Sequence, residues 1–285
     1  MNHRARLNLG LIGAAAALGA GVWFAQKEPQ KGPPLTPIAS EALTRIRIAH
    51  PGSPVIELKK GGGHWQLTAP VQAQADDMEI NALIDLAGKE THDPMAAPDL
   101  KQLGLEPPGY VITLNDTAID FGGVEPIRYR RYVKTAAGVA LIEDPASAAL
   151  DKDYGDLVAK ELLPADAVIE KVELPALTLD RNAGGQWQLT PADAKASADQ
   201  MQKLAEGWQH ARAMWNEMAA PADPKAAHLK LTLKGGAVRE FIVAATEPQL
   251  KLQRADLGVN YVLSKALVDQ LLKLPEVEKP KEEKK

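Results

Sequence analysis

The sequence contains no cysteine, and this absence excludes several kinds of chemistry. Disulfide bonds, thiol catalysis, thiolate metal sites and a lipoprotein-type acylated cysteine are all ruled out. Aromatic residues are also scarce, at 5% of a chain that is 45% hydrophobic. The core must therefore consist mainly of Leu, Val, Ile and Ala, and the five tryptophans stand out.

An excess of positive charge is missing as well. The formal net charge of the 285 residues is −4. A protein that holds nucleic acid normally carries a basic field that attracts the phosphate backbone. We therefore expect no nucleic-acid partner.

Recognisable catalytic or metal-binding spacing is also missing. The six histidines include no HExxH pattern and no pair at i, i+4, so no metal is expected. His92 and Asp93 are adjacent, and their place in a loop after a helix favours a structural role over a catalytic one. Asp76 and Asp77 stand at an expected helix start, which favours capping over acid–base chemistry or calcium binding. No catalytic residue and no cofactor is predicted.

The longest apolar run covers residues 7–25. As a helix it would be about 28 Å long, enough to cross a bilayer. Arg4 and Arg6 precede it, which places residues 1–6 in the cytoplasm and the bulk of the chain in the periplasm. We expect a single-pass signal-anchor in a bacterial inner membrane. A cleaved signal peptide is the alternative, because both begin with a basic segment and an apolar run.

Two segments without core residues flank the body of the chain. Residues 26–42 are rich in proline, which indicates an extended spacer. Residues 275–285 are highly charged, which indicates a disordered, solvated tail.

The body contains an internal repeat. The sequence Trp-Gln-Leu-Thr-Ala-Pro at residues 65–70 returns as Trp-Gln-Leu-Thr-Pro at residues 187–191, and apolar residues on both sides match at a similar offset. Such self-similarity predicts two copies of one structural unit, here residues 43–164 and 165–274. We expect Trp65 and Trp187 to occupy equivalent buried positions.

Each copy has the pattern of an antiparallel sheet with a helix. Alternating apolar residues on both sides of Gly61–Gly63 predict a hairpin, and that glycine run lacks the Lys-Ser/Thr of a phosphate loop. Capping residues, Asp76 in the first copy and Ser197 in the second, precede helical stripes. Further alternating strands follow, including 110–114 and 128–134. The predicted fold class is α+β, with one N-terminal transmembrane helix followed by two tandem repeats.

With these motifs in view, the chain resembles the DUF4340 family, whose domain has no known function. The resemblance rests on residues 46–70, on the Leu-Gly-Leu-Glu-Pro-Pro turn at 103–108, and on Lys-Glu-Leu-Leu-Pro at 160–164. It implies a membrane-anchored envelope protein, of a kind often encoded beside ABC-type transport or gliding-associated systems. The family pattern defines no catalytic residue, and the second copy lacks the 103–108 turn.

One segment stands out as a possible binding site because basic and aromatic residues alternate in an otherwise acidic protein. It comprises Arg128, Tyr129, Arg130, Arg131, Tyr132 and Lys134. One interpretation is a solvent-facing edge strand whose charges discourage pairing with other molecules. The other is a site for an anionic partner such as a lipid headgroup, a glycan or an acidic protein surface.

The leading functional hypothesis is a non-catalytic binding or scaffold protein. It would contact the inner membrane through residues 7–25. Its protein partner would be an envelope complex, for example an ABC-type transporter. The first alternative is an exported hydrolase acting on cell-wall or glycan substrate, which needs two carboxylates brought together by the fold. The second is a small-ligand sensor that binds between the two repeat units.

Overall fold

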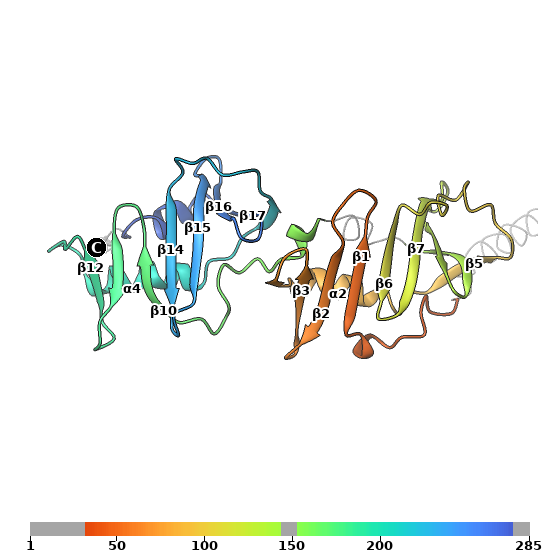
Figure 1. Ribbon diagram of the computed structural model, residues 1–285, viewed down its shortest axis with the longest axis horizontal. Coiled ribbons are helices and arrows are strands. Elements are labelled where there is room, and N and C mark those ends of the chain that lie inside the picture. The colour runs from red at the N-terminus through yellow and green to blue at the C-terminus, as the bar shows by residue number, and fades with distance from the viewer. Residues whose placement is uncertain (1–31, 144–152, 276–285) are drawn as a thin grey trace, which may run out of the picture.

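The computed structural model describes residues 32–143 and 153–275, in which two large antiparallel sheets follow one another along the long axis (Figure 1). The first sheet, with its helix, is called unit 1, and the second is called unit 2. From edge to edge, the nine strands of unit 1 are β4 (Ala73–Gln74), β3 (His64–Ala69), β2 (Ile56–Gly61), β1 (Arg45–Ala49), β6 (Tyr110–Leu114), β7 (Thr117–Val124), β8 (Arg131–Thr135), β9 (Gly138–Ile142) and β5 (Thr91–Met95). The eight strands of unit 2 are β12 (Trp187–Thr190), β11 (Thr178–Arg181), β10 (Ile169–Glu173), β14 (His228–Leu233), β15 (Val238–Ala245), β16 (Leu250–Arg254), β17 (Val259–Leu263) and β13 (Trp215–Met218).

The two sheets share one strand order. When β4 is set aside, each strand of unit 1 has a counterpart at the same place in unit 2, with β3 matching β12 at one side and β5 matching β13 at the other. The registers agree too, since Ile46 faces Leu58 in unit 1 as Val172 faces Leu179 in unit 2. The described chain thus contains two copies of one sheet topology.

The strands form where apolar residues alternate. In β1, Ile46 and Ile48 are buried while Arg45 and Arg47 are exposed. The predicted hairpin of β2 and β3 is confirmed, and its turn uses the positive φ angles of residues 62–63, which glycine adopts without steric cost.

Helices α2 (Asp77–Asp85) and α4 (Ala198–Gln209) pack on the sheets of units 1 and 2, and both predicted caps are confirmed. The Asp76 carboxylate accepts hydrogen bonds from the N–H groups of Met78 and Glu79, and Ser197 forms a capping box with Gln200. Unit 2 adds α5 (Leu267–Leu271), which packs on α4. Two short 3-10 helices, η1 (Ser40–Ala42) and η2 (Tyr154–Leu157), complete the described elements.

The two repeated tryptophans differ in burial, contrary to the expectation from the sequence. Trp65 is buried, because β4 and α2 cover its strand. Trp187 lies on edge strand β12, is only partly buried, and is covered on one side by the guanidinium of Arg181. The fully buried tryptophan of unit 2 is Trp208 on α4.

The predicted fold class is wrong. The described chain is mostly β-sheet, and none of its helices is long and apolar enough to cross a membrane. Residues 7–25, which carry the expected transmembrane helix, lie outside the described residues. The sheets contain strands that the sequence pattern did not predict, because β4, β5 and β13 lack regular alternation of apolar and polar residues.

The described part of the proline-rich segment lies along unit 1. The N–H of Leu35 donates to the Lys89 carbonyl at 2.6 Å, and the Thr36 hydroxyl donates to the Ala87 carbonyl at 3.0 Å. Both Leu35 and Thr36 are buried. Beyond Pro275, the charged tail lies outside the described residues.

Residues 153–164, called the connector, join the two units by backbone hydrogen bonds on both sides. Toward unit 1, the N–H of Ala159 donates to the Gln74 carbonyl at 2.9 Å. Toward unit 2, the N–H of Leu162 donates to the Ala211 carbonyl at 3.1 Å. The connector is therefore paired with β4 on one side and with the segment before β13 on the other.

Candidate functional site

The basic segment singled out in the sequence is not an edge strand. Its strand part, β8, lies between β7 and β9 in the interior of the sheet. The chain before it, including Arg128 and Tyr129, forms the turn that leads from β7 into β8. The interpretation as a charged edge strand is therefore wrong, and residues 128–130 of the predicted strand lie outside β8.

Three of the basic side chains interact within unit 1. Arg131 donates to the Gly122 carbonyl at 2.8 Å, and Lys134 donates to Asp120 at 3.4 Å. Tyr132 lies in the same strand and is partly buried. The third, Arg130, forms a small ion cluster of its own.

Arg130 is buried and pairs with two carboxylates. Its Nε donates to Glu143 at 2.8 Å and one Nη donates to Asp93 at 3.4 Å. His92, also buried, places Nε2 at 4.0 Å from Glu143, while its Nδ1 has no hydrogen-bond partner. Asp93 thus pairs with Arg130 directly, and His92 lies beside the second carboxylate of the same cluster.

Replacing Arg130 by glutamine should lower the free energy of unfolding by about 1–2 kcal/mol, because a buried side chain loses its ion pairs and packing. The carboxylate partners are more than half exposed and solvent-screened, which keeps the cost moderate. Arg128→Gln is the matched control, and at this exposed position the change should stay within about 0.5 kcal/mol. Urea denaturation measures both. Equal effects of the two substitutions would contradict the assigned roles.

Residues 125–130 form a hydrogen-bonded loop, called the knuckle. The Glu125 N–H donates to the Arg130 carbonyl at 2.7 Å, and the Tyr129 N–H donates back to the Glu125 carbonyl at 3.1 Å. The Glu125 carboxylate also accepts from the backbone N–H of Arg128 at 3.2 Å. Despite this internal order, the side chains of Ile127 and Tyr129 are 82% and 75% exposed.

The knuckle holds Tyr129 in an unusual conformation. Its φ angle is +56°, in the left-handed region that a bulky side chain rarely adopts. A residue held there costs about 1–3 kcal/mol, which the surrounding structure must offset. The hydrogen bonds within the knuckle hold the residue in this conformation.

The turn at residues 103–108, one of the segments on which the family resemblance rests, supports the base of the knuckle. The N–H of Gly123 donates to the Leu103 carbonyl at 2.8 Å, one residue before the end of β7. Gly104 has φ +68°, and a Cβ there would meet the Gly123 nitrogen at 3.0 Å. Leu105 is buried beside Gly122. A Cβ on Gly122 would lie 2.4 Å from the Leu103 carbonyl oxygen and 2.9 Å from the Leu105 side chain, which is too close.

Unit 2 has no equivalent of the knuckle. The loop between β15 and β16 contains Thr-Glu-Pro-Gln at residues 246–249, without a large apolar side chain. The 103–108 turn is also missing there. Any site at the knuckle therefore belongs to unit 1 alone.

A second charged cluster lies where the connector meets unit 1, and sequence reasoning missed it. The Lys160 ammonium is 3.2 Å from Asp76 and 3.2 Å from Glu79. Arg212 of unit 2 lies 3.7 Å from the same Asp76 and 2.8 Å from Glu161. The sequence near Asp76 predicted its capping role. It could not predict the ion pairs, because Lys160 and Arg212 are far from Asp76 in the sequence.

The carboxylates with shifted pKa values are not arranged for acid catalysis. A hydrogen bond from Lys251 at 2.7 Å lowers the pKa of Glu217, and the Arg254 guanidinium lowers the pKa of Asp256 in the same way. A general acid needs the opposite shift. In residues 32–143 and 153–275, no group of three or more His, Asp or Glu residues could hold a metal ion.

These features define the class of the molecule: a mostly antiparallel β protein of two like units, with one ordered, apolar and basic loop facing solvent. A family model, described as a domain of unknown function (DUF4340), matches residues 65–255. Because this is more than half of the chain, the protein belongs to the DUF4340 family, which confirms the resemblance drawn from its motifs. Neither the curated proteins nor the solved structures include a match to the chain.

Proposed function

We propose that this protein is a non-catalytic binding or scaffold component of an envelope complex, and that unit 1 contacts its partner through the knuckle. The observation that carries the proposal is an ordered loop that holds Ile127, Arg128 and Tyr129 in solvent. Single exposed apolar residues are common on protein surfaces and need no explanation. Here two of them lie in a loop held by internal hydrogen bonds, and Tyr129 also has a strained backbone, which supports a role for their positions.

The composition of the knuckle suits a protein partner. Tyrosine and arginine are enriched among residues that dominate binding energy, and burial of an Ile or Tyr side chain contributes about 1.5–3 kcal/mol. Arg128 adds a positive charge that favours an acidic rim around the partner's pocket. A preformed loop also loses little conformational entropy on binding. An ABC-type transporter of the same envelope is our proposed partner class.

The hydrolase alternative gains no such support. It requires a facing pair of carboxylates, one with a raised pKa. The shifts described for Glu217 and Asp256 are in the other direction.

The test compares partner recovery between two variants of the tagged full-length protein. Ile127→Ser combined with Tyr129→Gly should reduce recovery of the partner at least about tenfold, as expected when hot-spot side chains are lost. Stability should stay within about 1 kcal/mol, because both side chains are exposed and glycine accepts the positive φ angle. Met78→Ser is the control, since Met78 is 74% exposed on α2, away from the knuckle.

Quantitative mass spectrometry of the co-purified proteins gives the readout. A protein that is retained with Met78→Ser and lost with the double variant would support the proposal. If every co-purified protein is recovered equally with both variants, the knuckle is not the contact.

A further inference from the structure

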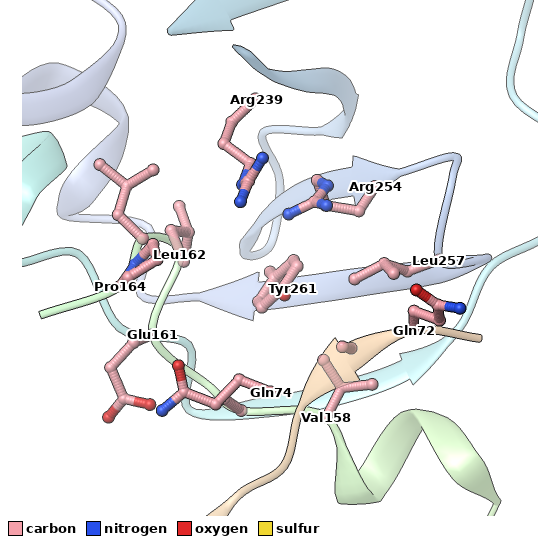
Figure 2. A pocket seen from close by; sticks show the side chains of 13 residues that line it. Gln72, Gln74, Val158, Glu161, Leu162, Pro164, Arg239, Arg254, Leu257 and Tyr261 are labelled. Carbon is pink, nitrogen blue, oxygen red and sulfur yellow. The ribbon is translucent and has the colours of Figure 1, made fainter. Parts of the chain in front are cut away.

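A cavity lies at the joint between the two units, with walls from unit 1, the connector and the sheet of unit 2 (Figure 2). Its volume is about 110 Å³. A water molecule in the liquid takes up about 30 Å³, so the cavity has room for a few waters or for one group of phosphate or carboxylate size. Two arginines and a tyrosine of unit 2, Arg239, Arg254 and Tyr261, line it.

Arg254 is 9% exposed, yet part of its guanidinium remains available. Its Nε and Nη2 donate to the Asp256 carboxylate at 2.8 and 2.6 Å, and the group lies 5.7 Å from the centre of the Phe241 ring. Within the described residues, Nη1 takes part in no hydrogen bond. Asp256 therefore fixes the orientation of the guanidinium and leaves one edge of it for another acceptor.

Arg239 carries a positive charge that no carboxylate of the described chain neutralises at ion-pair distance. Its one hydrogen bond within residues 32–143 and 153–275 goes to the carbonyl of the preceding residue, Val238, at 3.1 Å. The two carboxylates near the cavity have other partners, since Asp256 pairs with Arg254 and Glu161 pairs with Arg212 at 2.8 Å. Of the charged groups at the cavity, Arg239 is therefore the one without an ion-pair partner in the described chain, and it gives the cavity wall its unneutralised positive charge.

The hydroxyl of Tyr261 supplies an uncharged hydrogen-bond donor. It is buried on β17, and Figure 2 shows its ring in the cavity wall with both guanidinium groups on one side of it. Burial raises the pKa of Tyr261, so the hydroxyl keeps its proton at neutral pH. No acceptor for this hydroxyl occurs in the described part of the chain.

We propose that this cavity, the inter-unit pocket, binds one oxyanion, the phosphate or carboxylate group of a small ligand, through Arg239, Arg254 and Tyr261. Guanidinium groups match such oxygens in geometry and in charge. Asp256 is a positioning residue, because it acts through Arg254. Since the walls belong to both units and to the connector, an oxyanion in the pocket stabilises the joint in the arrangement described.

The test is isothermal titration of the purified full-length protein with inorganic phosphate and, separately, with acetate, at constant ionic strength maintained with chloride. Saturable binding of either is expected. Arg239→Gln should weaken it about tenfold or more, because a charge-assisted hydrogen bond is lost. The matched control is Arg47→Gln, on the exposed face of β1, which should bind like the wild type.

The two titrants distinguish the sources of the oxyanion: binding of phosphate alone identifies a phosphate ligand, and binding of acetate alone a carboxylate ligand. Circular dichroism verifies that each variant is folded, and Tyr261→Phe provides a conservative second variant that should weaken binding. Absence of saturable binding of both titrants, or equal affinity in the Arg239→Gln and Arg47→Gln variants, would overturn the proposal.

Discussion

Trp208→Ala should lower the free energy of unfolding of unit 2 by about 3–5 kcal/mol, the range measured when large aromatic residues are removed from a core. Trp208 has no solvent exposure, its ring lies 5.6 Å from that of Phe241, and its indole N–H donates to the Leu271 carbonyl at 2.9 Å. The substitution therefore creates a cavity and also removes the bond that ties α4 to α5. A loss of this size is a large share of the stability of an ordinary domain.

Trp187→Ala is the comparison that makes this result specific. Trp187 is the residue that the repeated motif marked, but it is only partly buried on edge strand β12. Its removal should cost about 1–2 kcal/mol, less than half the effect at Trp208. Chemical denaturation followed by circular dichroism measures both. An equal cost at the two positions would show that the motif tryptophan contributes more to the core than its exposure indicates.

Asp76→Ala should lower the free energy of unfolding by about 2–4 kcal/mol. Loss of the helix cap accounts for about 1 kcal/mol, and the rest comes from leaving the partly buried Lys160 ammonium with one carboxylate fewer. Asp76 is 3% exposed, and Lys160 is also well shielded from solvent. The cost is below that of a fully broken buried pair, because Glu79 stays within 3.2 Å of Lys160.

Two further variants separate the contributions at Asp76. Asp77→Ala removes the neighbouring, exposed carboxylate and should change stability by no more than about 0.5 kcal/mol. Adding Lys160→Met to Asp76→Ala should restore part of the loss, because the shielded ammonium that has lost one of its two carboxylates is then removed. If the added substitution lowers stability further by its full single-variant effect, the two residues act independently and the ion-pair explanation fails.

The parts of the fold that could be predicted are those encoded locally. Asp76 and Ser197 act on N–H groups two or three residues away, so their capping roles were visible in the sequence. The β2–β3 hairpin was equally visible, because the turn glycines and the alternation of both strands lie within one short segment.

The remaining parts depend on pairing between distant segments. Strand β5 contains His-Asp-Pro and has no apolar alternation, so only its pairing with β9 makes it a strand. Arg130 looked like a surface charge, but it is buried, and its partners Asp93 and Glu143 lie 37 and 13 residues away in the sequence. The joint cavity needs both units in place, because its wall combines residues 72–74 of unit 1 with Arg239, Arg254 and Tyr261 of unit 2.

The connector has a further consequence for the dimensions of the molecule. Its hydrogen bonds attach to β4 at the inner edge of unit 1 and to the segment before β13 at the inner edge of unit 2. The outer edges, β5 near the knuckle and β12 with Trp187, therefore lie at opposite ends of the long axis (Figure 1). The connector, bonded to both inner edges, therefore sets the distance between these two outer edges.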